Sequence, residues 1–133
     1  NGLAEAIEYA KAQGFEKDAL VEEFAVGQEY SIECISYEGV HYFLAMTKKF
    51  TTGAPGFIET GHIEPAPVSE NIQEQVKKVV FHALDSLEIR NGASHTELKV
   101  ASSGRIALIE IGGRMGGEAV WWSCRQELIS FVQ

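Results

Sequence analysis

The sequence has few of the residues that mark membrane, disulfide-rich or zinc-binding proteins. Its 133 residues include 2 cysteines and 3 prolines, and no apolar run reaches the roughly 18 residues that a membrane-spanning helix needs. Cys34 and Cys124 have neither CxxC spacing nor neighbouring zinc-type ligands, so we expect two buried thiols in a reducing compartment. These features predict a cytoplasmic protein with no membrane partner.

Positive charge is also scarce. Lysine and arginine number 11 against 19 aspartates and glutamates, which gives a formal net charge of -8. A protein that binds nucleic acid needs a broad basic surface for the phosphate backbone, so we expect no nucleic-acid partner.

The length and the 45% hydrophobic share are typical of a single domain over residues 1–133. The chain does not begin with methionine, and its first residues are typical of the middle of a helix–strand protein. We therefore expect this domain to be part of a larger protein.

The pattern of apolar residues predicts an α+β fold. Helical spacing and turn residues indicate three helices, from Leu3 to about Gly14, over 72–87 and from about Glu118, where Trp121 and Trp122 supply apolar side chains. Runs rich in β-forming residues indicate strands over 19–26, 29–37, 39–46, 57–64, 95–100 and 105–111. We expect an antiparallel β-sheet with the helices packed on one face.

Two glutamates lie on the last two predicted strands. A turn centred on Ser103-Gly104 with an even-numbered loop places Glu97 directly opposite Glu110, with about 5 Å between the Cβ atoms. Opposed like charges weaken a sheet unless they share a proton or bind a hard cation such as Mg²⁺. Three alternatives remain open: solvated glutamates, pairing with Lys99 and Arg114, or an odd-length loop that separates the two side chains.

The same register assigns the remaining hairpin residues to two faces. The residues expected to face the core are Leu98, Val100, Ala107, Ile109 and Ile111. The residues expected on the other face are His95, Glu97, Lys99, Leu108 and Glu110.

A glycine-rich segment, GGRMGG over 112–117, follows Glu110. Glycine lets the backbone pass close to a ligand, and the guanidinium of Arg114 can hold a phosphate or carboxylate with two parallel hydrogen bonds. A metal, a phosphate and an arginine form a coherent set, although a flexible turn with a surface arginine is the alternative.

The order HTELKV, RIALIEI and GGRMGG resembles the C-terminal metal-and-phosphate half of the ATP-grasp superfamily, and LVEEFAVGQEYSIE resembles its adenine and ribose segment. The resemblance implies ATP with Mg²⁺ or Mn²⁺ as cofactors. It further implies Glu97 and Glu110 as metal ligands, with Arg114 binding the phosphate or the acyl intermediate.

In the adenine and ribose segment, the resemblance implies that Glu22 lies beside the adenine, that Phe24 or Ala25 forms the hinge and that Glu29 binds the ribose hydroxyls. Lys48 and Lys49 follow a predicted strand, where adjacent side chains point to opposite faces, so at most one can face a phosphate. We choose Lys48.

The resemblance is to the C-terminal subdomain of an ATP-grasp fold, and FIETGHIEPAPVSE with IEIGGRMGG looks closest to the amino-acid ligases of the dipeptide and carnosine type. It implies an ATP-dependent carboxylate–amine ligase that works through an acyl phosphate and takes a small carboxylate or amino acid as substrate. The alternative is a non-catalytic nucleotide- or cation-binding interaction domain. A third interpretation is an α+β fold whose acidic residues are merely solvated.

Two departures from the family pattern affect these expectations. Gly112 stands where the family commonly has asparagine, and the glycine-rich phosphate loop of the family lies upstream of Asn1. We therefore expect an N-terminal lobe of the same protein as the intramolecular partner and negligible turnover by the isolated chain. An apolar face uncovered by that lobe favours self-association into a homo-oligomer.

Overall fold

The computed structural model describes residues 2–15, 17–53, 56 and 58–117. Within them the elements are α1 (Gly2–Gln13), β1 (Gln28–Tyr37), β2 (Val40–Thr51), β3 (Glu59–Ile63), α2 (Glu70–Ser86), β4 (Gly92–Val100) and β5 (Ile106–Gly112). The helix predicted from about Glu118 and the predicted thiol of Cys124 lie outside the described residues, whereas the predicted thiol of Cys34 is buried.

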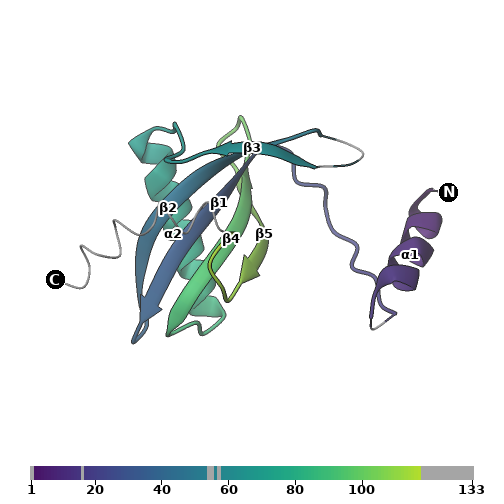
Figure 1. Cartoon of the computed structure of the whole chain (residues 1–133), viewed down its shortest axis with the longest axis horizontal. Helices are drawn as coiled ribbons and strands as arrows, with labels where there is room; N and C mark the ends of the chain where they lie inside the picture. Colours follow the sequence, from purple (N-terminus) through teal and green to yellow (C-terminus); the bar gives the residue numbers. More distant parts are fainter. Residues whose placement is uncertain (1, 16, 54–55, 57, 118–133) are drawn as a thin grey trace.

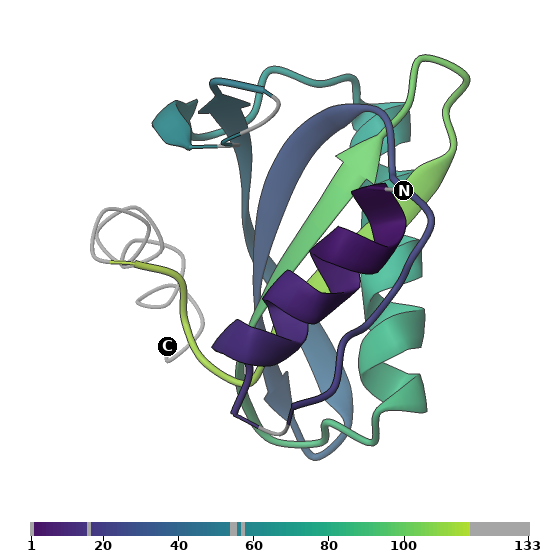
Figure 2. The same cartoon turned by 90° about the vertical axis from the view of Figure 1, so that its right-hand side faces the viewer.

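The five strands form one antiparallel sheet in the order β3-β2-β1-β4-β5, and α2 lies across one face of it (Figures 1 and 2). The apolar stripe of α2 is the reason for this packing, because Val76, Val80 and Leu84 are fully buried against Ile32 and Leu98. The fold is therefore α+β with an antiparallel sheet, as predicted.

The N-terminal helix differs from α2 in its packing. α1 forms where helical spacing predicts it, and Gly14 donates its N–H to the carbonyl of Ala10 at the helix end. It has no buried residues and stands apart from the sheet in Figure 1. The prediction that helices pack on one face thus holds for α2 alone among the described helices. None of the described helices is long and apolar enough to cross a membrane.

The strand predicted over 19–26 is wrong. This segment lies outside the sheet, and its apolar residues Leu20 and Val21 are exposed. A run of β-forming residues becomes a strand only when it pairs with a neighbouring strand. Here the segment instead connects α1 to the start of β1.

The hairpin of β4 and β5 confirms one predicted pairing and corrects others. Glu97 pairs with Glu110 as predicted, but a register shift follows, so that Leu98 pairs with Leu108 rather than Ile109. Ile109 is the extra residue of a β-bulge. The bulge places Leu108 on the α2 side and Ala107 on the opposite side, which reverses the predicted faces of these two residues, while Ile111 packs against the core as predicted.

Candidate functional site

The sheet face opposite α2 carries a row of charged side chains. Side chains alternate between faces along a strand, so the residues Ile32 and Leu98 that face α2 are each flanked by residues of the polar face. Three cross-strand pairs of β1 and β4 make up the centre of this face: Glu29 with Lys99, Ser31 with Glu97, and Glu33 with His95.

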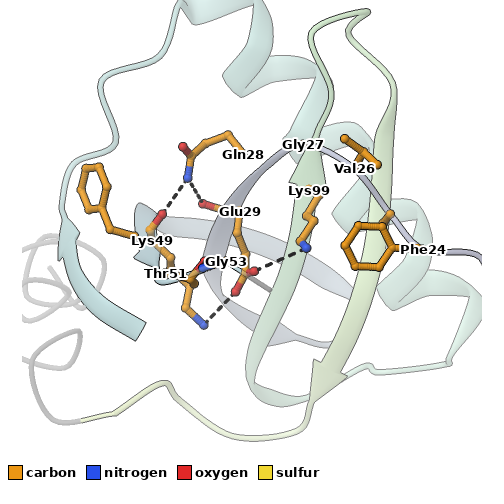
Figure 3. A pocket seen from close by; sticks show the side chains of 11 residues that line it. Phe24, Val26, Gly27, Gln28, Glu29, Lys49, Thr51, Gly53 and Lys99 are labelled. Carbon is orange, nitrogen blue, oxygen red and sulfur yellow. Dashed lines mark hydrogen bonds and ion pairs between the residues drawn. The ribbon is translucent and has the colours of Figure 1, made fainter. Parts of the chain in front are cut away.

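Lys49 on β2 is the cation at the middle of this row. Its Nζ lies 2.8 Å from Oε1 of Glu97, 3.3 Å from Oε1 of Glu29 and 3.4 Å from Oε2 of Glu59. The side chain is only 13% exposed. Figure 3 shows the Lys49 ammonium directed toward the carboxylate of Glu29, beside Lys99, whose Nζ lies 3.9 Å from Oε2 of the same glutamate.

The structure does not place Lys48 in this group. Its ammonium lies over the ring of Phe50, 5.1 Å from the ring centroid. Lys48 pairs with Tyr30, a core residue on the α2 side of β1. Only one of the two adjacent lysines reaches the polar face, as alternation requires, but it is Lys49 rather than Lys48.

Neighbouring charged groups strongly shift the pKa values of Glu97, His95 and Lys49. Hydrogen bonding from His95 lowers the pKa of Glu97 to about 2, against the opposing effect of burial and with further help from Lys49. Hydrogen bonds to Glu33 and Glu97 raise the pKa of His95 to about 9. Burial lowers the pKa of Lys49, but its bonds to Glu97 and Glu29 outweigh this and raise it to about 12. All three groups are therefore charged near neutral pH.

A pocket opens where the 24–29 segment meets β2 and β4. Its volume is about 320 Å³, and it is lined by Phe24, Ala25, Gln28, Glu29, Lys49 and Lys99, among others (Figure 3). Phe24 contributes a ring that lies 5.2 Å from Nζ of Lys99. One wall is thus aromatic and apolar, and the opposite wall carries the charges of Glu29 and Lys49.

Close backbone packing holds this pocket together. A Cβ on Gly27 would lie 2.6 Å from the carbonyl carbon and oxygen of Val100, and the glycine has φ +153°. Gln28 donates from Nε2 to the carbonyl of Lys49 at 2.6 Å, which ties the segment to β2. On the N-terminal side of Gly27, Glu23 forms a bidentate ion pair with Arg105, whose two Nη atoms lie 2.9 and 3.0 Å from the carboxylate oxygens.

Glu22 lines a neighbouring hollow with Glu97, Lys99 and Ile109. The predicted adenine and ribose residues Glu22, Phe24, Ala25 and Glu29 therefore all border one continuous region of the polar face.

The other predicted metal and phosphate residues lie at the β5 edge. Glu110 is exposed and pairs in register with Glu97, so the two carboxylates leave the sheet on the same face. Arg114 is also exposed, and its Nη1 donates to the carbonyl of Met115 at 3.1 Å. The sequence offered Lys99 and Arg114 as alternative partners of Glu97; in the structure Lys49 Nζ and His95 Nε2 lie 2.8 and 3.4 Å from its Oε1.

Residues that sequence reasoning missed include Glu33, Lys49 and Glu59. Glu33 Oε1 pairs with Nδ1 of His95, and Glu33 Oε2 accepts a hydrogen bond from the backbone N–H of Gly116 at 3.0 Å. A signal for Glu33 was present, because Glu29, Ser31 and Glu33 repeat at a spacing of two and alternate with the less polar residues Tyr30, Ile32 and Cys34.

Comparison with known proteins identifies the family. The family model described as the ATP-grasp domain matches residues 3–121, so the chain belongs to the ATP-grasp family. The chain is 31% identical over 129 residues to the alanine–anticapsin ligase of Bacillus subtilis strain 168, covering 88% of this chain and 27% of that protein. It is 29% identical over 104 residues to carnosine synthase 1 of Mus musculus, covering 78% of this chain and 12% of that protein.

Solved structures agree with this assignment. An L-amino acid ligase from Bacillus licheniformis superposes with a TM-score of 0.67 at 35% sequence identity, covering 71% of this chain and 24% of that chain. A biotin carboxylase from Campylobacter jejuni, at 14% identity and a TM-score of 0.72, shares the fold, with 86% of this chain and 26% of that chain covered. The chain spans about a quarter of the length of the first curated relatives that it matches, which are alanine–anticapsin ligases.

Proposed function

We propose that this chain is the ATP- and magnesium-binding part of an ATP-dependent carboxylate–amine ligase of the amino-acid type, which works through an acyl phosphate. The observation that carries the proposal is the position of Lys49, whose ammonium lies between Glu29 at the pocket and Glu97 on β4. The likeness to an alanine–anticapsin ligase, an L-amino acid ligase and carnosine synthase supports a small carboxylate or amino-acid substrate.

In this proposal the pocket at the 24–29 segment holds the nucleoside. The ring of Phe24 and the backbone around Ala25 offer the flat apolar surface and hydrogen-bonding groups that an adenine needs, with Glu22 beside them. Glu29 is placed to accept hydrogen bonds from two ribose hydroxyls, because its carboxylate borders the same pocket.

The donor set at β4 and β5 fits a magnesium ion. Glu97 and Glu110 are paired across the hairpin on one face of the sheet, with Glu97 half-buried and Glu110 exposed. Mg²⁺ is commonly held by one or two carboxylates, with water and substrate phosphate completing the octahedron. No group of three or more acidic, histidine or cysteine side chains suited to a metal occurs in the described part of the chain. The nucleotide phosphates would therefore supply the remaining ligands. When bound, Mg²⁺ or Mn²⁺ would neutralise charge on the triphosphate.

The protein groups position and neutralise the reacting phosphate. An oxygen of the substrate carboxylate attacks the γ-phosphorus, the bond to the bridging oxygen breaks, and ADP leaves with that electron pair. The amine then attacks the carbonyl carbon, loses its proton and expels inorganic phosphate. Lys49 and Arg114 would balance the negative charge of the transferred phosphoryl group. In this scheme Lys49 takes the role that the sequence assigned to Lys48.

The first experiment is calorimetric titration of the chain with ADP in the presence and absence of Mg²⁺. We expect binding that depends on Mg²⁺, with Glu97→Gln weakening it by about tenfold or more. The matched control is Glu64→Gln, because Glu64 also accepts a hydrogen bond on this sheet, from Thr47 Oγ1 at 2.7 Å, but is not assigned to the nucleotide. No binding, or equal effects of both variants, would contradict the proposal.

A second measurement concerns catalysis. We propose that an N-terminal lobe of the same protein completes the enzyme, so the 133-residue chain alone should form no acyl phosphate from ATP and an amino acid. A glycine-rich loop flanked by lysines upstream of Asn1 would support the enzyme over a non-catalytic nucleotide-binding domain. Measurable ATP-dependent turnover by the chain alone would disprove the need for that lobe.

A further inference from the structure

A buried carboxylate that has no assigned contact with the nucleotide joins two parts of the proposed site. Glu33 is 1% exposed, and its cross-strand neighbour His95 is 7% exposed. One oxygen of Glu33 pairs with Nδ1 of His95, and the other accepts the Gly116 N–H at 3.0 Å. Burying a carboxylate is costly unless it is paired and hydrogen-bonded, so these two bonds account for its position inside the protein.

The two partners of Glu33 belong to different parts of the site. On one side, Nε2 of His95 lies 3.4 Å from Oε1 of Glu97, the proposed metal ligand on β4. On the other side, Gly116 follows Arg114 by two residues in the glycine-rich segment. Glu33 is therefore the shared point between the carboxylate on β4 and the segment that carries the arginine.

Only glycine fits at residue 116. A Cβ built there would lie 2.5 Å from Oε1 of Glu33 and 2.9 Å from Nδ1 of His95. Such contacts are too short, so a side chain would push the segment away from β1 and β4. By contrast, a Cβ on Gly113 would have no heavy atom within 4 Å. The glycines of this segment thus differ in their structural importance.

We propose that Glu33 and His95 are positioning residues of the nucleotide site, which hold Glu97 and the Arg114 segment in one arrangement without touching the nucleotide. This inference rests on the proposed function. Its physical basis is the chain of contacts from Gly116 through Glu33 and His95 to Glu97. Residues that orient a ligand-binding side chain typically change affinity by about 10- to 100-fold when they are replaced.

The test uses two variants with matched controls. Glu33→Gln removes the carboxylate and is compared with Glu64→Gln; Gly116→Ala introduces the blocked Cβ and is compared with Gly113→Ala, for which space is available. Three quantities are measured on each 133-residue chain: hydrogen exchange of the Gly116 amide by NMR, Mg²⁺-dependent affinity for ADP by calorimetry, and the free energy of unfolding in urea.

We expect the Gly116 amide to exchange about tenfold faster or more in Glu33→Gln than in the parent chain. The affinity for ADP should fall by about tenfold or more in both Glu33→Gln and Gly116→Ala, and by less than about twofold in the controls. This loss of ADP affinity should be larger than the loss that the unfolded fraction of each variant, calculated from its free energy of unfolding, would cause under the titration conditions. If Glu33→Gln does not fold, Gly116→Ala decides the affinity comparison.

Two results would overturn the proposal: an unprotected Gly116 amide in the parent chain, or unchanged ADP affinity in a folded Gly116→Ala variant. If the parent chain binds no ADP, the proposed function of the chain fails. The exchange measurement then still decides the contact itself, since slow exchange in the parent and fast exchange in Glu33→Gln would establish that Glu33 holds the segment.

Discussion

Lys49 and Glu97 meet across an intervening strand. Lys49 lies on β2 and Glu97 on β4, with β1 between them, yet Nζ and Oε1 are 2.8 Å apart. The lysine side chain therefore crosses β1, where its Nζ also lies 3.3 Å from Oε1 of Glu29. The sequence left open whether a shared proton, a hard cation or a basic side chain compensates the charge of Glu97, and in the structure Lys49 and His95 both contact its carboxylate.

We expect Lys49→Gln to lower the free energy of unfolding by about 1 to 3 kcal/mol, because Glu29, Glu59 and Glu97 lose their common partner in a mostly buried position. Lys48→Gln is the matched control and should cost less than about 1 kcal/mol, since it removes only a contact with the Phe50 ring. Urea unfolding at neutral pH measures both. A larger effect of Lys48→Gln would show that the two lysines are assigned to the wrong faces.

The sequence could predict that only one of these lysines reaches the polar face, but not which one. Phe43 and Met46 both face α2, although an uninterrupted strand would place them on opposite faces. The register shift beside Glu33 and Cys34 adds one residue, Leu44, and changes the alternation for the rest of β2. Counting from Phe43 without this bulge selects Lys48, whereas the bulge brings Lys49 to the site.

A β-bulge also explains why only some of the predicted pairings in the hairpin of β4 and β5 are correct. The predicted even-numbered loop is wrong, because Val100 pairs with Ile106 and leaves an odd number of residues in the loop. Glu97 still pairs with Glu110, because the bulge at Ile109 adds one residue before that pair, whereas Ala107 and Leu108 lie between the turn and the bulge. A bulge depends on how a strand bends against its neighbours, which local propensity does not specify. Glu33 required a further long-range fact, because its partners His95 and Gly116 are distant in sequence.

The stability of the chain should depend on pH on both sides of neutrality. Glu97 has a pKa of about 2 in the fold against an ordinary 4.5, so its contribution is present above about pH 4.5 and is lost as the pH falls toward 2. His95 has a pKa of about 9 against an ordinary 6.5, so its contribution is complete below about pH 6.5 and is lost as the pH rises through 9.

The alkaline side gives the clearer measurement, because many carboxylates titrate together in acid. Between pH 6.5 and 9 the free energy of unfolding should fall by about 2 to 3 kcal/mol. His95→Gln should remove most of this slope. The control His62→Gln, whose ring is 38% exposed beside Glu59, should retain it. A flat profile in the parent chain would contradict a protonated His95 in the folded protein.

Gly27 should be essential for the position of the pocket segment. A Cβ there would meet the backbone of Val100 at 2.6 Å, and backbone atoms of a central strand cannot move aside easily. We expect Gly27→Ala to lower the free energy of unfolding by about 1 to 3 kcal/mol. Gly61→Ala is the control, because a Cβ on Gly61 has no heavy atom within 4 Å. Equal stabilities in urea would show that the segment does not pack on β4.

Self-association is expected at high protein concentration. Leu3 and Tyr9 on α1 are 63% and 70% exposed, and Leu20 in the following segment is 82% exposed. Exposed apolar groups of this size favour contact with a second copy of the chain. Light scattering after size exclusion should show a mass that rises with concentration, and Leu3→Ser with Leu20→Ser should reduce it. A strict monomer at all concentrations would refute this expectation.

Gly112 offers a direct test of the proposed metal pair. The family commonly has asparagine at this position, and a Cβ on Gly112 meets no atom closer than 3.5 Å, the nearest being the flexible Arg114 side chain. Gly112 pairs with His95 on β4, so its side-chain direction is the polar face that carries Glu97 and Glu110. An asparagine there would add an amide oxygen, a ligand type that binds hard cations.

We therefore expect Gly112→Asn to strengthen Mn²⁺ binding in the presence of ADP by about threefold to tenfold, measured by electron paramagnetic resonance of free Mn²⁺. Gly113→Asn is the control, because it adds the same amide beyond the end of β5, where a Cβ has no heavy atom within 4 Å, and it should leave the affinity unchanged. If both variants strengthen Mn²⁺ binding equally, the gain comes from an added polar side chain near the site and not from a metal ligand at residue 112. If Gly112→Asn has no effect while ADP still binds, the metal lies away from Glu110, and Glu97 alone would be its protein ligand on this hairpin.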